Sequence, residues 1–546
     1  MTDDPGGIDI PTPDGAVNTI DTDYTVGQDN VQGSVGALQF DIHNPVFLIS
    51  SLTVVAFVLV TLIFQDTASG VFNWLFTFVT TTFDWFFLAA ANVFVVFCLG
   101  VAISPLGRVR LGGADAKPDY GYMSWFAMLF AAGMGIGLMF FGVLEPVYHM
   151  QVSAPLGLQG PYQDGVLQLD QVAAARAHGL SATIFHWALH PWSIYAVVAL
   201  ALALFTYNKQ LPLSIRSAFY PLLGDRVWGW PGHAIDIIAV FATLFGLTTS
   251  LGLGAQQATA GMNYVYGVPN TLNTQIIVIA CVTAVALISV VRGLEGGVKV
   301  LSNVNMCLAG LLLLFVFVTG PTLAILQDAG IGLVTYLGDV VPLSNPFGRD
   351  DDSFRESWTA FYWAWWISWS PFVGMFIARV SRGRTVREFV TCVILIPSLV
   401  SVFWMATFGG SAIHQVIQMG QDSGVYENVI ANYNDALAMF AMLGALPLTA
   451  LTSTLAIILV LVFFITSSDS GSLVIDTITA GGKTEAPTAQ RVFWAVTEGV
   501  VAIVLLVGGG LTALQAMVNA TGIFFTIVLL VLCYSTYRGL KSEPRG

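Results

Sequence analysis

Long, nearly uninterrupted runs of apolar residues recur along the chain from Pro45 to Tyr534. A helix needs about 20 such residues to cross the roughly 30 Å of hydrocarbon in a bilayer. The pattern therefore predicts an all-α polytopic membrane protein with twelve transmembrane helices. The predicted spans are 45–65, 83–103, 122–148, 179–205, 233–259, 274–291, 298–326, 354–377, 385–408, 446–468, 493–507 and 511–534.

The positions of Lys and Arg test this count, because basic residues gather in the short cytoplasmic loops of membrane proteins. With the N-terminus inside the cell, 17 of the 20 Lys and Arg residues fall in cytoplasmic loops and tails. Only Arg176, Arg349 and Arg355 fall outside. The sequence predicts a multi-pass protein of the plasma membrane with both termini in the cytoplasm.

The composition agrees with a membrane protein and narrows its partners. Of 546 residues, 55% are hydrophobic and only 10% are charged, which excludes a soluble domain. The net charge of −13 leaves little basic surface for nucleic acid and is typical of a halophilic source. All five cysteines lie in apolar runs, so the sequence offers neither a disulfide framework nor a cysteine metal site.

Two predicted helices contain residues that interrupt helices, at corresponding places five helices apart. Span 122–148 contains Gly133, Gly135 and Gly137, and span 354–377 contains Pro371. Interrupted helices in matching positions of two halves indicate an inverted-repeat secondary transporter with a binding site at mid-membrane. The alternative is that the glycines only allow close helix packing.

This pattern predicts six segments. They are an acidic disordered cytoplasmic tail (1–44), two additional transmembrane helices (45–121), a first five-helix repeat (122–326), an extracellular linker with room for an amphipathic helix (327–353), a second five-helix repeat (354–534) and a short cytoplasmic tail (535–546).

Aromatic residues cluster inside two predicted spans rather than at the lipid interface. Trp187, Trp192 and Tyr195 share an arc of span 179–205, and Tyr362, Trp366 and Trp369 share a face of span 354–377. Indole faces attract a cation that lacks hydrogen-bond donors, as a trimethylammonium group does. The sequence predicts a site for a quaternary ammonium; the alternative is that these are packing and interface residues.

Two segments, 131–142 and 361–385, closely resemble the betaine/choline/carnitine transporter family, and the likeness extends from about residue 40 to 535. The resemblance implies a LeuT-like fold with two inverted five-helix repeats, spans 3–7 and 8–12, and usually a homotrimer in contact with membrane lipid. It also implies sodium-coupled uptake of a quaternary-ammonium osmolyte. No other cofactor is implied.

The resemblance assigns roles to individual residues. The substrate-binding residues that it implies are Trp187, Trp192, Tyr195, Trp365, Trp366, Trp369, Gly133, Gly135 and Gly137. The sodium ligands that it implies are Ala131, Met134, Phe463, Thr466 and Ser467. Thr243 and Phe372 match a second sodium site, but Leu247 stands where the family has its other threonine, with Thr248 and Thr249 as substitutes if the register of the helix bends. A glycine at position 137 is typical of sodium-coupled betaine carriers, whereas proton-coupled choline carriers commonly have Asp there.

The leading interpretation is a carrier that takes up glycine betaine with sodium by alternating access. A choline or carnitine carrier, driven by protons or by ion-independent exchange, remains an alternative, and so does an osmosensor that does not transport. The short C-terminal tail disfavours the osmosensor. The chain has none of the HExxH, GxSxG or P-loop motifs, so it is not expected to be an enzyme. Glu145, His186 and His190 are expected to have structural roles.

Overall fold

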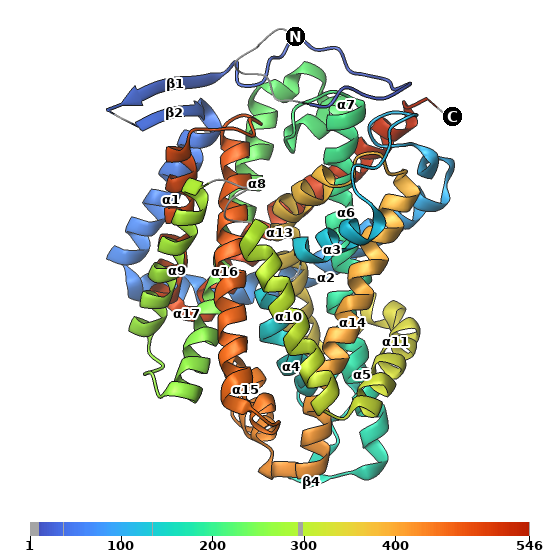
Figure 1. Ribbon diagram of the computed structural model, residues 1–546, viewed down its shortest axis with the longest axis vertical. Coiled ribbons are helices and arrows are strands. Elements are labelled where there is room, and N and C mark those ends of the chain that lie inside the picture. The colour runs from blue at the N-terminus through green and yellow to red at the C-terminus, as the bar shows by residue number, and fades with distance from the viewer. Residues whose placement is uncertain (1–9, 37, 134, 293–298, 545–546) are drawn as a thin grey trace.

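The computed structural model describes residues 10–36, 38–133, 135–292 and 299–544, and nearly all of its regular structure is helical (Figure 1). The helices are α1 (Asn44–Ile63), α2 (Gln65–Ile103), α3 (Tyr122–Gly133), α4 (Ile136–Gln151), α5 (Leu169–Trp187), α6 (Leu189–Ala203), α7 (Tyr220–Leu223), α8 (Trp230–Tyr266), α9 (Leu272–Arg292), α10 (Lys299–Thr319), α11 (Thr322–Ser344), α12 (Asp352–Phe354), α13 (Ala360–Arg379), α14 (Val386–Met419), α15 (Ala438–Gly444), α16 (Thr449–Thr479) and α17 (Thr488–Lys541). Two antiparallel hairpins pair β1 (Asn30–Val35) with β2 (Leu38–His43) and β3 (Tyr162–Gln163) with β4 (Val166–Leu167).

Within the described residues, ten helices are long and apolar enough to cross a membrane, which confirms the predicted polytopic all-α class. The predicted span 122–148 is not among them because it is divided between α3 and α4, and α17 alone covers the last two predicted spans. Helix α13 is not among the ten either, because it contains four tryptophans, whose polar N–H groups lower its mean hydropathy. The number of crossings, twelve, remains a prediction.

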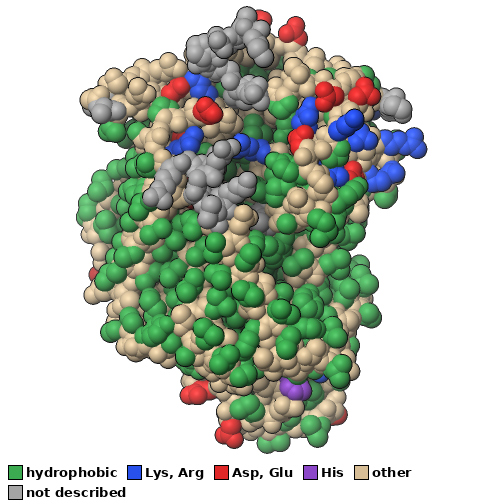
Figure 2. Space-filling view, in the orientation of Figure 1, with side chains coloured by type: hydrophobic (Ala, Val, Ile, Leu, Met, Phe, Trp, Pro, Cys, Tyr) green, Lys and Arg blue, Asp and Glu red, His purple; other side chains and the backbone are tan. Residues whose placement is uncertain are grey.

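Burial separates a central group of helices from an outer group. The most apolar window of α5 and α6 is 94% buried and that of α8 is 83% buried, whereas the window of α10 is only 22% buried. Hydrophobic side chains cover the middle of the face shown in Figure 2, and the Lys and Arg visible there gather at the end that holds both termini in Figure 1. The outer helices, α1, α9, α10 and α11, therefore expose apolar side chains on the surface of the molecule.

The predicted interruption at the glycine stretch is confirmed, since α3 ends at Gly133 and α4 begins at Ile136. The predicted interruption at Pro371 is wrong, because α13 is continuous from Ala360 to Arg379. Proline cannot donate to the carbonyl four residues earlier, here that of Ile367. The hydroxyl of Ser370 donates to this carbonyl at 2.6 Å instead, so the helix continues with its acceptor satisfied.

An interruption that the sequence analysis did not predict divides span 179–205. Helix α5 ends at Trp187, Ala188 has φ −117° and ψ −112°, and α6 begins at Leu189. The cause is Pro191, which has no N–H to donate to the carbonyl of Trp187 four residues earlier. A further bend divides α17, where Gly510 has φ 63°, in the region that glycine tolerates best.

The segment predicted as a linker, 327–353, belongs mostly to α11. Gly320 and Pro321 end α10 at Thr319. Helix α11 begins at Thr322, five residues before the predicted start of the linker at residue 327. Helix α11 packs against α5 and α14. Asp328 of α11 is held by an ion pair of 2.5 Å with Arg176 of α5.

The N-terminal tail differs from the predicted disorder over its described part. Strands β1 and β2 form a hairpin. The side-chain amide of Asn30 in this hairpin donates to the backbone carbonyl of Ala480 at 2.8 Å. Asp41 forms an ion pair of 2.6 Å with Lys483. The Asp residues that suggested a solvated tail thus include one that pairs with a basic residue of the loop between α16 and α17.

Arg216 attaches this tail to the helices. Its guanidinium is fully buried, lies 3.2 Å from the carboxylate of Asp236 and donates to the hydroxyl of Tyr24 at 2.9 Å. It also contacts Nε2 of His43 at 3.1 Å. Burial, with the charge of Arg216 adding to it, lowers the pKa of His43 to about 3, so the neutral imidazole accepts this bond. Tyr24 stacks on Trp228 with ring centroids 4.1 Å apart.

We expect Arg216→Met to destabilise the protein and release the tail. The change leaves Asp236 buried without its ion-pair partner, at a cost on the order of 3 kcal/mol. The measurements are thermal unfolding in detergent and the rate at which a protease cleaves the N-terminal segment. The control is Arg379→Met, because the side chain of Arg379 at the end of α13 is exposed and forms no ion pair with the tail among the described residues. Equal stability and cleavage in both variants would contradict this role of Arg216.

Candidate functional site

The predicted aromatic residues come together where α5, α6 and α13 meet. Each of these side chains is 5% exposed or less. The end of α5 at Trp187 places that ring opposite α13, and α6 packs along α13. The aromatic cluster consists of Trp187, Trp192, Tyr195, Trp365, Trp366 and Trp369.

Trp366 lies at the middle of the aromatic cluster. Its ring stacks on that of Trp365, with centroids 5.0 Å apart and an angle of 13° between planes. Trp187 meets it edge to face at 4.9 Å, and Tyr195 does so at 6.1 Å. Trp192 joins through Tyr195 at 5.4 Å, and Trp369 joins through Trp365 at 6.3 Å. The structure therefore brings all six predicted aromatic residues into one connected set.

Hydrogen bonds fix the orientation of four indoles. The N–H of Trp366 donates to the backbone oxygen of His186 at 3.0 Å, and that of Trp369 donates to the backbone oxygen of Gly246 at 2.9 Å. Trp365 donates to the hydroxyl of Ser250 at 3.2 Å. The fourth, Trp187, donates to a carboxylate. The N–H edges of these four indoles are thus occupied by protein acceptors, and Trp365 and Trp366 also cover one face of each other.

The glycine stretch lies directly against these rings. A Cβ at Gly133 would lie 2.6 Å from the ring of Trp192, and one at Gly137 would lie 2.7 Å from Trp187 and 3.1 Å from Trp365. Neither position accepts a side chain unless the rings move. The structure therefore places the glycines beside the aromatic cluster, and it also shows the close packing that was the alternative interpretation.

The predicted sodium ligands that the structure describes lie on two segments, with Ala131 in the last turn of α3 and Phe463, Thr466 and Ser467 in α16. Met134 lies outside the described residues. A Cβ at Gly135 would lie 3.5 Å from the ring of Phe463 and 3.9 Å from Oγ of Ser467. The interruption between α3 and α4 therefore lies beside the predicted ligands of α16. The sodium assignment itself remains a prediction.

The hydroxyl of Thr466 donates to backbone carbonyls of its own helix, at 3.0 Å to Val462 and 3.1 Å to Phe463. This is the back-bonding common for threonine in helices, and it leaves the lone pairs of the oxygen available. At the doubtful second site, Thr243 donates in the same way to Ala239 at 2.7 Å, and Phe372 packs on Trp369.

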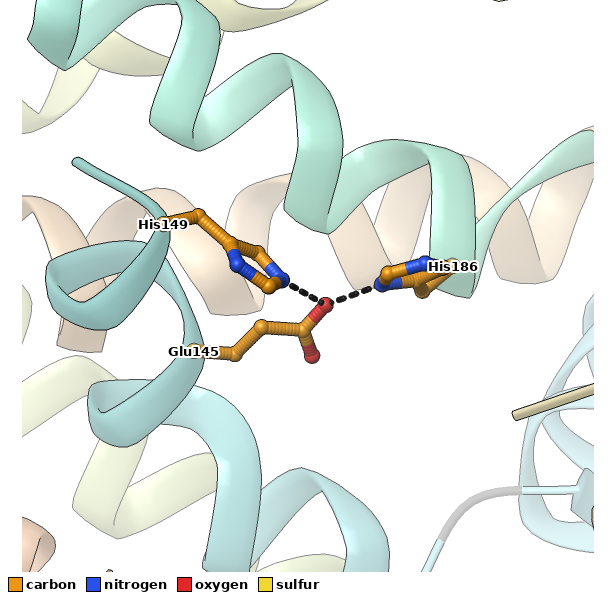
Figure 3. Close-up of side chains that lie close together, drawn as sticks. All are labelled: Glu145, His149 and His186. Atoms are coloured by element: carbon orange, nitrogen blue, oxygen red, sulfur yellow. Dashed lines mark hydrogen bonds and ion pairs between the residues drawn. The ribbon is translucent and has the colours of Figure 1, made fainter. Parts of the chain in front are cut away.

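A buried carboxylate beside the aromatic cluster has more partners than the sequence analysis expected. Figure 3 shows Glu145 of α4 facing His149 and His186. Its Oε1 lies 2.6 Å from Nδ1 of His186 and 3.2 Å from Nε2 of His149. Its Oε2 accepts from the indole of Trp187 at 2.7 Å and from the hydroxyl of Tyr362 at 2.6 Å. The sequence signal was a Glu and a His one helical turn apart in an apolar helix.

His190, the other histidine considered from the sequence, has a separate environment. It contacts the side-chain oxygen of Asn92 at 3.1 Å and stacks on Trp363, with centroids 5.4 Å apart. Both partners lie outside the aromatic cluster, which agrees with the structural role expected of His190.

Comparison with known proteins adds independent observations. Residues 45–545 match the model of the family described as "BCCT, betaine/carnitine/choline family transporter". The chain is 57% identical over all its length to a "Glycine betaine/proline/choline transporter" of Vibrio parahaemolyticus, 98% of which is covered. It is 55% identical over 96% of its length to "Glycine betaine transporter 1" of the same organism, 97% covered. It is 44% identical over 86% of its length to the Bacillus subtilis "Glycine betaine transporter OpuD", 88% covered.

If the aromatic cluster binds a quaternary ammonium, its ring faces should determine affinity. Replacing Trp366 or Trp369 by Leu keeps an apolar side chain but removes the π face. The expected loss is roughly 1–2 kcal/mol, or about 5–30-fold in affinity for betaine, measured by calorimetry on purified protein. Trp74→Leu is the control, because Trp74 is 61% exposed on α2 and should leave the affinity unchanged. Equal affinity in wild type and both cluster variants would show that the rings only pack.

Proposed function

Because the chain belongs to the betaine/carnitine/choline transporter family, we propose that it takes up glycine betaine together with sodium across the plasma membrane. It is a multi-pass membrane transporter and not an enzyme. The observation that best supports this substrate is the aromatic cluster. Trp187 and Trp365 pack against Trp366 in this cluster, and the indole N–H of Trp366 is bonded to a backbone oxygen. The names of the Vibrio and Bacillus relatives, all of which include glycine betaine, support the same substrate.

The two ends of betaine suit two parts of this region. Its trimethylammonium group has no hydrogen-bond donor, so ring faces attract it without a carboxylate partner. Its carboxylate suits the start of α4, where the first amides of a helix have no partners within the helix and the dipole favours an anion. Gly133, Gly135 and Gly137 leave no side chain between that helix end and the rings.

Burial of the proposed site supports alternating access as the mechanism that we propose. The cluster residues are 5% exposed or less, so a solute reaches their faces only when the surrounding helices move. The interruptions between α3 and α4 and between α5 and α6 border the cluster and separate rigid helical pieces. We propose that these pieces move relative to α13. In this proposal both termini, which lie at one end of the molecule in Figure 1, are cytoplasmic, as the distribution of Lys and Arg indicates.

For the coupling ion we propose sodium between α3 and α16. Alkali cations prefer hard oxygen ligands, and the hydroxyl of Ser467 lies beside Gly135 at the break between α3 and α4, with Thr466 next to it in α16. Leu247 removes a hydroxyl from the second site implied by the family, so one sodium per betaine is the proposed stoichiometry.

Uptake into proteoliposomes tests the function and its coupling. Labelled betaine should accumulate under an inward sodium gradient and not when potassium replaces sodium outside. The double variant Thr466→Ala, Ser467→Ala lacks two hydroxyl ligands and should need a much higher sodium concentration for half-maximal uptake. Thr497→Ala is a control, since this hydroxyl only donates to the carbonyl of Phe493 in α17. Accumulation by wild type without any sodium gradient would contradict sodium coupling, and full accumulation by the double variant at low sodium would contradict this site.

Gly137→Asp tests which residue selects the substrate. A carboxylate there should repel the carboxylate of betaine and attract choline, which carries a cation and no anion. Gly137→Ala is the matched control, because any Cβ at this position meets Trp187 and Trp365. We expect both variants to lose betaine uptake and only the Asp variant to gain choline uptake relative to betaine. An unchanged preference for betaine in the Asp variant would show that Gly137 serves packing alone.

A further inference from the structure

Glu145 is a carboxylate at the centre of four hydrogen-bond donors. It is fully buried in α4, and the donors come from His149 of α4, from His186 and Trp187 of α5, and from Tyr362 of α13. A buried carboxylate is costly unless its oxygens are occupied, and here each oxygen accepts twice. The side chain thus joins three helices at one point.

Two of the four donors are rings at the aromatic cluster. Trp187 belongs to it, and Tyr362 lies 5.6 Å from Trp187 and stacks at 5.9 Å on Trp366. The bond from Trp187 to Glu145, at 2.7 Å, is shorter than the bonds of 2.9 to 3.2 Å that the other cluster indoles make to neutral oxygens, and the hydroxyl of Tyr362 donates to the same carboxylate at 2.6 Å. Short distances are typical of hydrogen bonds to a charged acceptor, which are also about twice as strong as neutral ones.

The histidines hold the carboxylate from its other side. Nε2 of His186 is 2.9 Å from the hydroxyl of Thr359, which can donate to it while Nδ1–H donates to Glu145. His149 has an acceptor at each ring nitrogen, with Glu145 at Nε2 and the backbone oxygen of Ser153 at Nδ1. Both histidines therefore hold Oε1 of Glu145, while Trp187 and Tyr362 hold Oε2.

We propose that Glu145 is a positioning residue for the cation, which it does not touch. Its carboxylate fixes the planes of Trp187 and Tyr362, and its negative charge draws their N–H and O–H protons and so raises the electron density of both rings. A richer ring face attracts a quaternary ammonium more strongly. This inference rests on the proposed function, and it assigns to Glu145 a part of the affinity that the rings alone would lack.

The first variant is Glu145→Gln, which keeps the shape and one acceptor oxygen but removes the charge. We expect betaine to bind about tenfold more weakly by calorimetry, the size of effect that loss of a charged hydrogen-bond acceptor produces. In uptake assays KM should rise by a similar factor while kcat changes less than about twofold, since binding of the ground state is what is lost. The control is Asp328→Asn, a buried carboxylate of α11 that pairs with Arg176 and contacts none of the rings; it should leave the betaine affinity unchanged.

A double-mutant cycle separates positioning from a general structural role. Trp187→Phe with Tyr362→Phe keeps both ring faces and removes both donors to Glu145. In this background Glu145→Gln should weaken betaine binding less than about twofold further, because the rings no longer bond to the carboxylate. A tenfold loss that persists in this background would overturn the proposal, and so would unchanged affinity in Glu145→Gln alone.

A third comparison covers the case in which Glu145→Gln does not fold. Trp187→Phe removes a donor to a carboxylate, and Trp365→Phe removes one to a neutral hydroxyl, with Glu145 intact in both. The larger loss of affinity should come from Trp187→Phe, and an equal or smaller loss would overturn the proposal. Wild-type protein that neither binds nor takes up betaine would refute the proposed function instead, so the two failures are distinguishable.

Discussion

The structure depends on one constraint, that hydrocarbon supplies no hydrogen bonds and each polar group inside the bundle needs a partner in the protein. The carbonyl of Ile367 shows how the constraint acts, because Ser370 supplies the hydrogen bond that Pro371 cannot. The carboxylate of Glu145 shows the same constraint for a charged group, since four donors from His, Trp and Tyr side chains occupy its oxygens. Both lie beside residues of the aromatic cluster, and Glu145 also holds the indole of Trp187.

The same constraint explains why the helices break where they do. At Gly133 the chain leaves the helix beside rings that would clash with a larger residue, and at Ala188 it leaves because Pro191 frees the carbonyl of Trp187. Such breaks inside a membrane are tolerated where protein surrounds them, and the residues at both breaks are buried, Gly133 and Ile136 at the first and Trp187 and Ala188 at the second. Free backbone groups and aromatic faces thus occur side by side, the combination that a zwitterion with a quaternary ammonium requires.

Much of this could be predicted from the sequence, because apolar runs, glycine clusters and aromatic spacing act locally. The helices, the break near Gly133 and the gathering of Trp187 and Trp366 all follow from such patterns. Pro371 misled the prediction because its effect was cancelled by the hydroxyl next to it. The order of the tail was missed because it depends on partners far along the chain, as Tyr24 does on Arg216. The connection of Glu145 to Tyr362 also joins residues that are distant in sequence, so no local pattern contained it.

The central claim is that the aromatic cluster holds the cation of betaine, and a structure of the protein with glycine betaine bound in sodium buffer tests it most directly. The account predicts the trimethylammonium nitrogen within about 6 Å of the ring centroids of Trp366 and Trp369, over their faces. Glu145 should then still accept from Trp187 and Tyr362. Betaine bound elsewhere, with these rings packed on one another as they are without it, would contradict the account.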